Sequence, residues 1–147
     1  MQNKNIFIIT GIVVVLGIIL FASFGNEAKI QSIDSENLIS QNGIHWHPEL
    51  TIYKNGEKIE LPSDIGLGTT HNPIHTHDED AASGVLHLEF NGLVYQKDTK
   101  LSEFFKVWNK DINSFGSNMT MTVNGIASNE FGDYLMKDGD KIELIYE

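Results

Sequence analysis

The pattern of apolar and polar positions divides the chain into three parts. Residues 6–24 form an uncharged, almost entirely apolar stretch. Residues 26–43 are polar and show no sustained period, which is typical of a stalk. From residue 44 onward, short alternations indicate β-strands, and one stretch with helical spacing interrupts them. We therefore expect an anchor at 1–25, a stalk at 26–43 and one folded domain at 44–147.

The folded part opens with a predicted β-hairpin. Residues 50–54 and 57–61 alternate in polarity and flank an Asn-Gly pair, which is preferred in two-residue type I′ turns. Because the turn sets the register, the apolar residues of both strands lie on one face. Extending the alternation backwards places His45 and His47 on the opposite face. Pro48 lacks an N–H, so it predicts an edge strand or a bulge at this point.

An amphipathic helix and further strands complete the pattern. From Asp98 onward, apolar residues recur at i, i+3, i+4 and i+7, which is helical spacing. These residues are Leu101, Phe104, Phe105 and Trp108. Residues 119–123 predict a strand, and residues 134–146 predict a closing pair of strands. We expect the helix to lie across the sheet, so the predicted fold class is α+β.

Five of the six histidines fall in three short clusters, at residues 45–47, 75–77 and 87–89. Alternate residues of a strand point to the same face, so each His-x-His pair presents two imidazoles side by side. A loop at 63–73, rich in Gly, Thr and Pro, delivers the second pair. Imidazole binds zinc, copper, iron and nickel, so the clusters predict a metal site.

The residues expected to bind the metal are His75, His77, His87, His47 and His45. The first three return to neighbouring strands through a short connection. His47 is the expected fourth ligand, and His45 is its substitute or belongs to a second site. Glu89 shares a strand face with His87, where it is a ligand, a residue that orients the imidazole, a general base or a solvated carboxylate. His71 stands alone, and we do not expect it to be a ligand.

The composition limits which ligands and partners the chain can have. The 147 residues include ten lysines, no arginine and 20 acidic residues, for a formal net charge of -10. Phosphate binding needs clustered cations, so nucleic acid is not an expected partner. Cysteine is absent, which excludes thiolate ligands and thiolate catalysis. The expected cofactor is a copper or zinc ion, and copper is favoured because Cu(II) heads the affinity order for divalent ions.

The apolar stretch at 6–24 predicts a membrane segment. As a helix it can cross a hydrocarbon core about 30 Å thick, so we expect a single-pass transmembrane anchor. A cleavable signal peptide is the alternative, but its apolar region is usually shorter and residues 22–24 match a cleavage site poorly. Lys4 precedes the stretch and acidic residues follow it, which predicts a domain on the extracytoplasmic side of the cell membrane.

The C-terminal region resembles a known family. Residues 121–125 contain Val-Asn-Gly, and residues 134–144 contain Asp-Gly-Asp ahead of the last strand. These motifs resemble the close of β-grasp (ubiquitin-like) domains, especially the small sulfur-carrier proteins. The resemblance implies a β-grasp-like mixed sheet with one helix packed on it. Sulfur carriers end in Gly-Gly whereas residues 145–147 read Ile-Tyr-Glu, so their activity is not implied. The whole chain also looks like membrane-anchored, histidine-rich ectodomains of archaeal type, to which no established activity is attached.

Three functions follow from these patterns. The first is a metal-binding protein that handles metal or supports a membrane protein complex. The second is a metalloenzyme of the hydratase or hydrolase type, in which three histidines leave one position open and Glu89 accepts a proton. The third is a metal-free interaction module whose histidines titrate near neutral pH. The chain has no phosphate-binding glycine loop and no Gly-x-Ser-x-Gly motif, which favours binding over catalysis.

Overall fold

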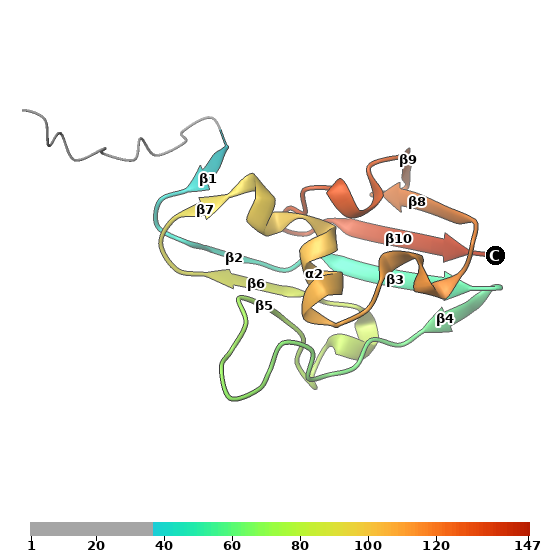
Figure 1. The fold of residues 1–147 in the computed structure, drawn as a ribbon, viewed down its shortest axis with the longest axis horizontal. Coiled ribbons are helices and arrows are strands. Elements are labelled where there is room, and N and C mark those ends of the chain that lie inside the picture. Colours follow the sequence, from blue (N-terminus) through green and yellow to red (C-terminus); the bar gives the residue numbers. More distant parts are fainter. Residues whose placement is uncertain (1–36) are drawn as a thin grey trace, which may run out of the picture. The chain divides into compact units, whose positions relative to one another are not determined.

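The computed structural model describes residues 37–147, which fold around a five-stranded sheet (Figure 1). The strands are β3 (Glu49–Lys54), β4 (Glu57–Ile59), β8 (Met119–Val123), β9 (Ile126–Ser128) and β10 (Lys141–Tyr146). Their order in the sheet is β4-β3-β10-β8-β9. The last strand lies in the middle, where it pairs with β3 in parallel and with β8 in antiparallel orientation.

Two Asn-Gly turns close the outer hairpins of this sheet. Asn55 and Gly56 have φ angles of 51° and 83°, and Asn124 and Gly125 have φ angles of 53° and 78°. Positive φ at both positions is what a type I′ turn requires, and asparagine and glycine tolerate it best. The predicted register of the first hairpin is confirmed, because Ile52 lies opposite Ile59.

A second sheet of three strands carries the histidine clusters. Its strands are β2 (Ile44–Trp46), β5 (Ile74–His75) and β6 (His87–Phe90), in the order β2-β6-β5. The chain runs from β2 into β3 through His47 and Pro48, where the predicted irregularity occurs. A third sheet pairs β1 (Leu38–Ser40) with β7 (Val94–Tyr95). The strand β1 lies within the stretch that we expected to be a stalk.

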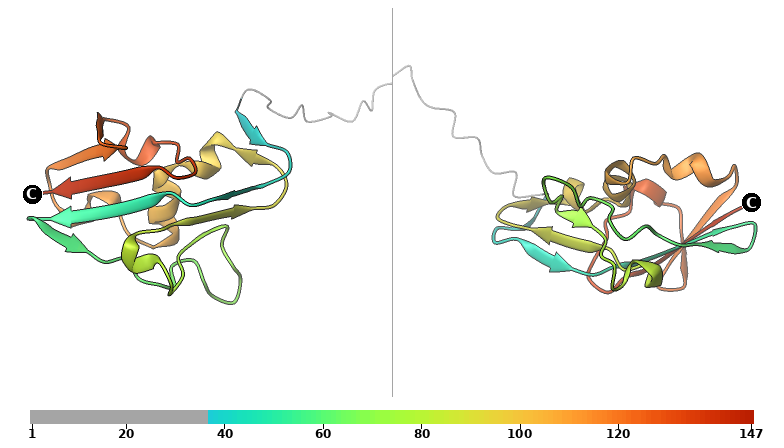
Figure 2. Two further views of the ribbon diagram at one scale, coloured as in Figure 1. Left: turned by 180° about the vertical axis from the view of Figure 1, so that it is seen from behind. Right: turned by 90° about the horizontal axis from the view of Figure 1, so that it is seen from below.

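One α-helix and four short 3₁₀ helices complete the described residues. They are α2 (Leu101–Val107), η1 (Ala81–Ser83), η2 (Gln96–Thr99), η3 (Ile112–Phe115) and η4 (Phe131–Asp133). The helix α2 covers one face of the five-stranded sheet, in front of β3 and β10 in Figure 1 and behind them in the left view of Figure 2. This is the amphipathic helix that the apolar spacing predicted.

The hydrophobic core fills the space between α2 and the strands. Its fully buried members include residues of α2, the middle strands and β6: Leu101, Phe104, Ile52, Leu144, Tyr146 and Leu88. The hydroxyl of Tyr146 donates a hydrogen bond of 2.6 Å to the carbonyl oxygen of Ile112. Burial of this phenol, with a smaller contribution from Asp111, raises the pKa of Tyr146 to about 12.

The predicted fold class is wrong. We expected an N-terminal transmembrane helix followed by a single β-grasp-like mixed sheet under one helix. The regular secondary structure of residues 37–147 is instead mostly strand, with one short α-helix and three separate sheets. No helix within these residues is long and apolar enough to span a membrane. The stretch expected as the anchor, residues 6–24, lies outside the described residues. The expectation failed because pattern alone does not show which strands join the same sheet.

The predicted pair of strands at 134–146 is also wrong, because only its second half forms a strand. The carboxylate of Asp140 organises the first half into a loop: it accepts hydrogen bonds from the Tyr134 hydroxyl at 2.7 Å and the Lys137 N–H at 2.9 Å. Leu135 makes only an isolated bridge to Lys100. Burial, and then the hydrogen bond to Asp140, raises the pKa of Tyr134.

Candidate metal centre

The pairing of β5 with β6 brings the second and third histidine clusters together. His75 lies directly opposite His87 in this antiparallel pair. The buried residue between the two histidines of the second cluster, Thr76, fixes the end of the strand, because its hydroxyl donates to the carbonyl of Pro62 and accepts from the N–H of Ile65. The loop that leads into β5 can approach this strand because one of its residues is a glycine.

That residue is Gly66, which has a φ of 76°. A Cβ atom at this position would lie 2.4 Å from the carbonyl oxygen of Ile74 and 3.1 Å from the Cβ of His75. The carbonyl of Gly66 also accepts a hydrogen bond of 2.9 Å from the N–H of Asn72. Glycine is therefore required here both by the backbone angle and by the space.

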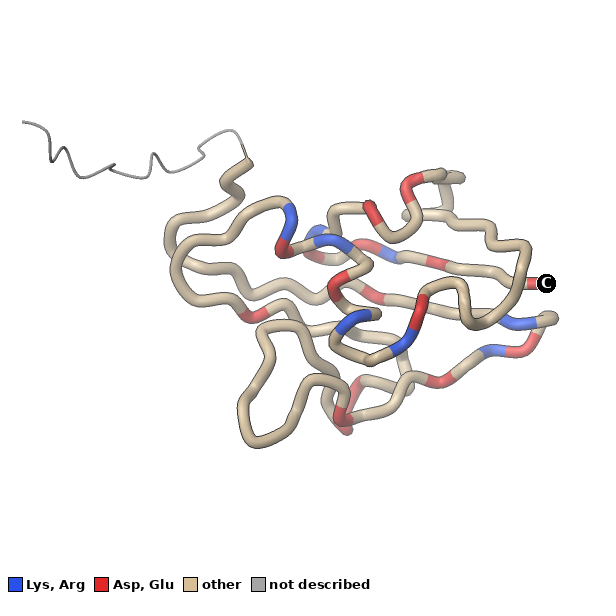
Figure 3. The backbone as a smooth tube through the Cα atoms, in the orientation of Figure 1, with Lys and Arg blue, Asp and Glu red and all other residues tan. Residues whose placement is uncertain are grey.

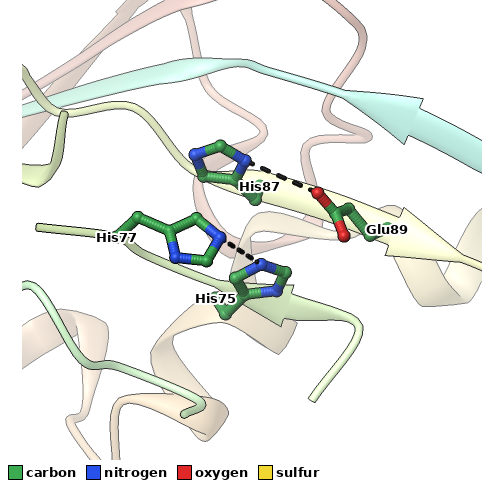
Figure 4. A group of neighbouring side chains, drawn as sticks. All are labelled: His75, His77, His87 and Glu89. Atoms are coloured by element: carbon green, nitrogen blue, oxygen red, sulfur yellow. Dashed lines mark hydrogen bonds and ion pairs between the residues drawn. The ribbon is translucent and has the colours of Figure 1, made fainter. Parts of the chain in front are cut away.

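Four side chains converge in front of the two strands. They are His75, His77, His87 and Glu89, here called the inner group (Figure 4). One ligand atom from each lies within 4.8 Å of the others. The Nε2 atoms of His75 and His77 are 3.0 Å apart, and the rings of His77 and His87 have centroids 4.6 Å apart. The inner group can therefore hold a metal ion.

The surroundings of His75 determine which of its nitrogens carries the lone pair. Its Nδ1 lies 3.0 Å from the carbonyl oxygen of Asn72, which only accepts hydrogen bonds. The ring hydrogen of a neutral His75 therefore belongs on Nδ1, and the lone pair lies on Nε2, facing His77. Burial lowers the pKa of His75, and the neighbouring His77 and His87 lower it further against opposing effects of Asn72 and Glu89. The neutral, ligating form is favoured.

His87 is held in a comparable way by Asp80. Its Nε2 lies 2.9 Å from Oδ2 of Asp80, so this nitrogen carries the hydrogen and donates it. The other nitrogen, Nδ1, is buried and has no hydrogen-bond partner. Within residues 37–147 only one other buried side-chain polar atom lacks a partner, and it is Oδ1 of the same Asp80. The Oε1 atom of Glu89 lies 3.8 Å from His87 Nδ1, which is too far for a hydrogen bond.

A second set of possible ligands adjoins the first. His45, His47 and His87, here called the outer group, also have ligand atoms within 4.8 Å of one another. The rings of His45 and His47 are 4.7 Å apart, and those of His47 and His87 are 4.8 Å apart. Nε2 of His45 lies 3.1 Å from Oε1 of Glu89. The backbone N–H of His47 donates a hydrogen bond of 2.8 Å to Asp138.

His71 is the residue that sequence reasoning left out. Its ring stacks on that of His75, with centroids 5.7 Å apart and planes within 3°. All six histidines therefore form one continuous cluster of neighbouring rings. No spacing signal could have included His71, because it stands alone in a loop and reaches His75 only through the turn made at Gly66 and Asn72.

A cleft of about 670 Å³ borders the histidine cluster. Its wall includes His45, His71 and His75 of the cluster and the neighbouring Glu89, and no lysine lines it within the described residues. Figure 3 shows the charged positions along the backbone, and the segment from residue 62 to residue 77 carries no lysine. This segment therefore contributes no lysine side chain that would repel a bound cation.

Comparison of the chain with family models, with curated proteins and with solved structures returned no match. The resemblance to β-grasp domains stays a prediction, because nothing in these comparisons bears on it.

Proposed function

We propose that this protein binds a divalent transition-metal ion, copper or zinc, through the inner group, and that its function is metal handling. One observation carries the proposal: the buried Nδ1 of His87 has no hydrogen-bond partner, while Asp80 holds the other nitrogen of the ring. An unpaired buried nitrogen costs about 1–3 kcal/mol, and an ion at this position would remove that cost. A carboxylate or carbonyl behind each ligating imidazole is also usual in metal sites.

The donor set supports copper and zinc equally well. Two nitrogens bound about 2.0 Å from one ion are roughly 2.8 Å apart at a right angle and roughly 3.3 Å apart at the tetrahedral angle. The distance of 3.0 Å between the Nε2 atoms of His75 and His77 lies between these values. Three imidazoles with one carboxylate suit tetrahedral zinc, and imidazole also suits Cu(II), which binds divalent sites most tightly.

Metal analysis of the purified full-length protein tests the proposal. We expect one copper or zinc ion per chain after loading and dialysis, and nitrogen couplings from several imidazoles in the EPR spectrum of the copper form. His87→Ala should abolish stoichiometric binding. A wild-type protein that retains no ion after loading with either metal would contradict the proposal.

A metalloenzyme is the second candidate, and the cleft is the observation that favours it. A substrate in the cleft would lie beside His75 and Glu89, which line its wall. If Glu89 is not bound to the ion, three histidines leave a coordination position for water, and the Glu89 carboxylate can accept its proton. Carbon dioxide hydration and cleavage of an activated ester, both measured on the zinc-loaded protein against free zinc, test this candidate.

The predicted surroundings of the domain stay predictions. They are a membrane partner through residues 6–24, a membrane protein complex and an extracytoplasmic location. Neither the proposed site nor its tests depend on them.

A further inference from the structure

The inner and outer groups overlap, so they are not two independent sites. Both contain His87. Glu89 of the inner group reaches the outer group, because its Oε1 lies 3.1 Å from Nε2 of His45 and 3.8 Å from Nδ1 of His87. An ion in either group would therefore be within reach of the same imidazole and the same carboxylate.

The histidine side chains become less exposed from His45 and His47 towards His87 and His75. The side chain of His45 is 65% exposed and that of His47 is 43% exposed. The shared side chain of His87 is 12% exposed, and His75 is 3% exposed. The imidazoles of the outer group are therefore more accessible to an ion arriving from solvent than that of His75.

The shared histidine has one nitrogen to offer. Nε2 of His87 is occupied by Asp80, so Nδ1 is the nitrogen left for a metal. One lone pair binds one ion, and His87 can therefore complete the outer group or the inner group, but not both together. The two groups are alternative positions for a single ion.

We propose that the outer group is the first binding position for the ion and that the ion then passes to the inner group by ligand exchange at His87. In this step the bonds from the ion to His45 and His47 break, and bonds to His75 and His77 form. The bond to His87 persists. The number of protons on the neutral imidazoles does not change, and no electron is transferred. The cargo is a labile divalent ion with affinity for imidazole. This inference rests on the proposed function.

Glu89 is placed to keep the ion bound during this exchange, because its carboxylate lies near histidines of both groups. The Glu89 side chain is 42% exposed and lies between the exposed ring of His45 and the partly buried ring of His87. It can stay bound while the imidazoles are exchanged, because its Oε1 already lies near both His45 and the shared His87. The ion would thus remain coordinated throughout the transfer.

Cobalt(II) provides a probe that separates the two positions, because its visible absorption reports on the ligands. Metal-free full-length protein is mixed rapidly with cobalt(II), and the absorption is followed with time. We expect the wild-type protein to bind one cobalt ion per chain. The His45→Ala/His47→Ala variant should load at least tenfold more slowly and then reach the wild-type spectrum.

The complementary variant and a control complete the experiment. His75→Ala/His77→Ala should bind cobalt rapidly but more weakly, with a different spectrum, because only the outer position remains. Thr120→Ala, which changes an exposed residue of β8 away from the histidines, should load at the wild-type rate. If the alanine variant of the outer group does not fold by circular dichroism, His45→Gln/His47→Gln replaces it.

Two results would overturn this inference while leaving the proposed function intact. One is wild-type loading kinetics in the variant of the outer group, and the other is binding of two cobalt ions per chain to the wild-type protein. If the wild-type protein binds neither cobalt, copper nor zinc, the proposed function itself fails, and this inference fails with it.

Discussion

His75 and His87 face each other across the antiparallel strands β5 and β6, with ring centroids 5.4 Å apart and ring planes within 17°. Each ring has one nitrogen held by an oxygen, from the Asn72 carbonyl or the Asp80 carboxylate. The other nitrogen of each ring is thereby left for a ligand, since a neutral imidazole has one donor and one acceptor.

Replacing a single imidazole of the inner group should weaken metal binding sharply. His75→Ala, His77→Ala and His87→Ala each remove a bond that the remaining ligands cannot replace. We expect each change to lower the affinity at least tenfold, which corresponds to about 1.4 kcal/mol. Competition with a chelator of known affinity measures it.

The matched control for this series is His71→Ala, which removes a ring that stacks on His75 without contributing to the inner group. It should have the smallest effect of the four changes. Equal and small effects at all six histidines would indicate diffuse chelation by the surface and would contradict a defined site.

Removing the carboxylate behind His87 should weaken binding although Asp80 is not among the expected ligands. Asp80→Ala frees Nε2 of His87, so the ring is no longer held with Nδ1 towards the inner group. Loss of such a partner typically costs 10–100-fold in metal affinity. Asp78→Ala, which removes the same charge from an exposed position, should leave the affinity within about threefold of the wild-type value by this reasoning. Equal losses in both variants would point to a general charge effect.

Glu89→Gln distinguishes a metal carrier from a catalyst. The change removes the charge while keeping the size, so the fold should persist and metal affinity should fall modestly. We expect no hydratase or esterase activity to be lost, because the wild-type protein should have none above that of the free ion. A general base contributes roughly 10²–10⁴ in rate. A rate loss of that size at full metal occupancy would establish the metalloenzyme instead.

Alkaline conditions should destabilise the fold through Tyr146. The pKa of this phenol is raised to about 12 in the folded protein, against about 10 in an unfolded chain. Its stabilising contribution is therefore complete below pH 10 and is lost as the pH rises from about 10 to about 12, because the unfolded chain releases the proton first. Urea unfolding at a series of pH values measures this loss.

Tyr146→Phe is the control for this pH dependence. It removes the hydrogen bond to the carbonyl of Ile112, so it should lower stability at neutral pH by about 1 kcal/mol. The loss of stability between pH 10 and pH 12 should become smaller in this variant. An unchanged alkaline transition would assign the effect to other groups, such as Tyr134, whose pKa is also raised.

Local signals in the sequence predicted the parts of the site that depend on neighbouring residues. The alternation around His87 and Glu89 placed both side chains on the face opposite Leu88, which is fully buried. The Asn-Gly turn at residues 55 and 56 set the hairpin register correctly. These features follow from strand geometry and turn chemistry, which act over a few residues.

Long-range contacts determine what the sequence could not predict. The strand β5 has only two residues, too few to show a pattern, and it exists because it pairs with β6. The contribution of Asp80 depends on a loop that folds back over seven residues to His87. The loop around Asp140 likewise depends on Tyr134 and Lys137 rather than on strand propensity.

The close approach at Gly66 bears on how the protein would choose between ions. A Cβ atom at Gly66 would lie against the Cβ of His75, so the backbone of the loop runs close to this ligand and limits how far it can shift when an ion arrives. A rigid ligand loses little conformational entropy on binding, which strengthens the binding of an ion that fits. The same rigidity penalises an ion that needs longer bonds or more ligands. Selectivity would then be decided by the folding of the loop, before any metal is present.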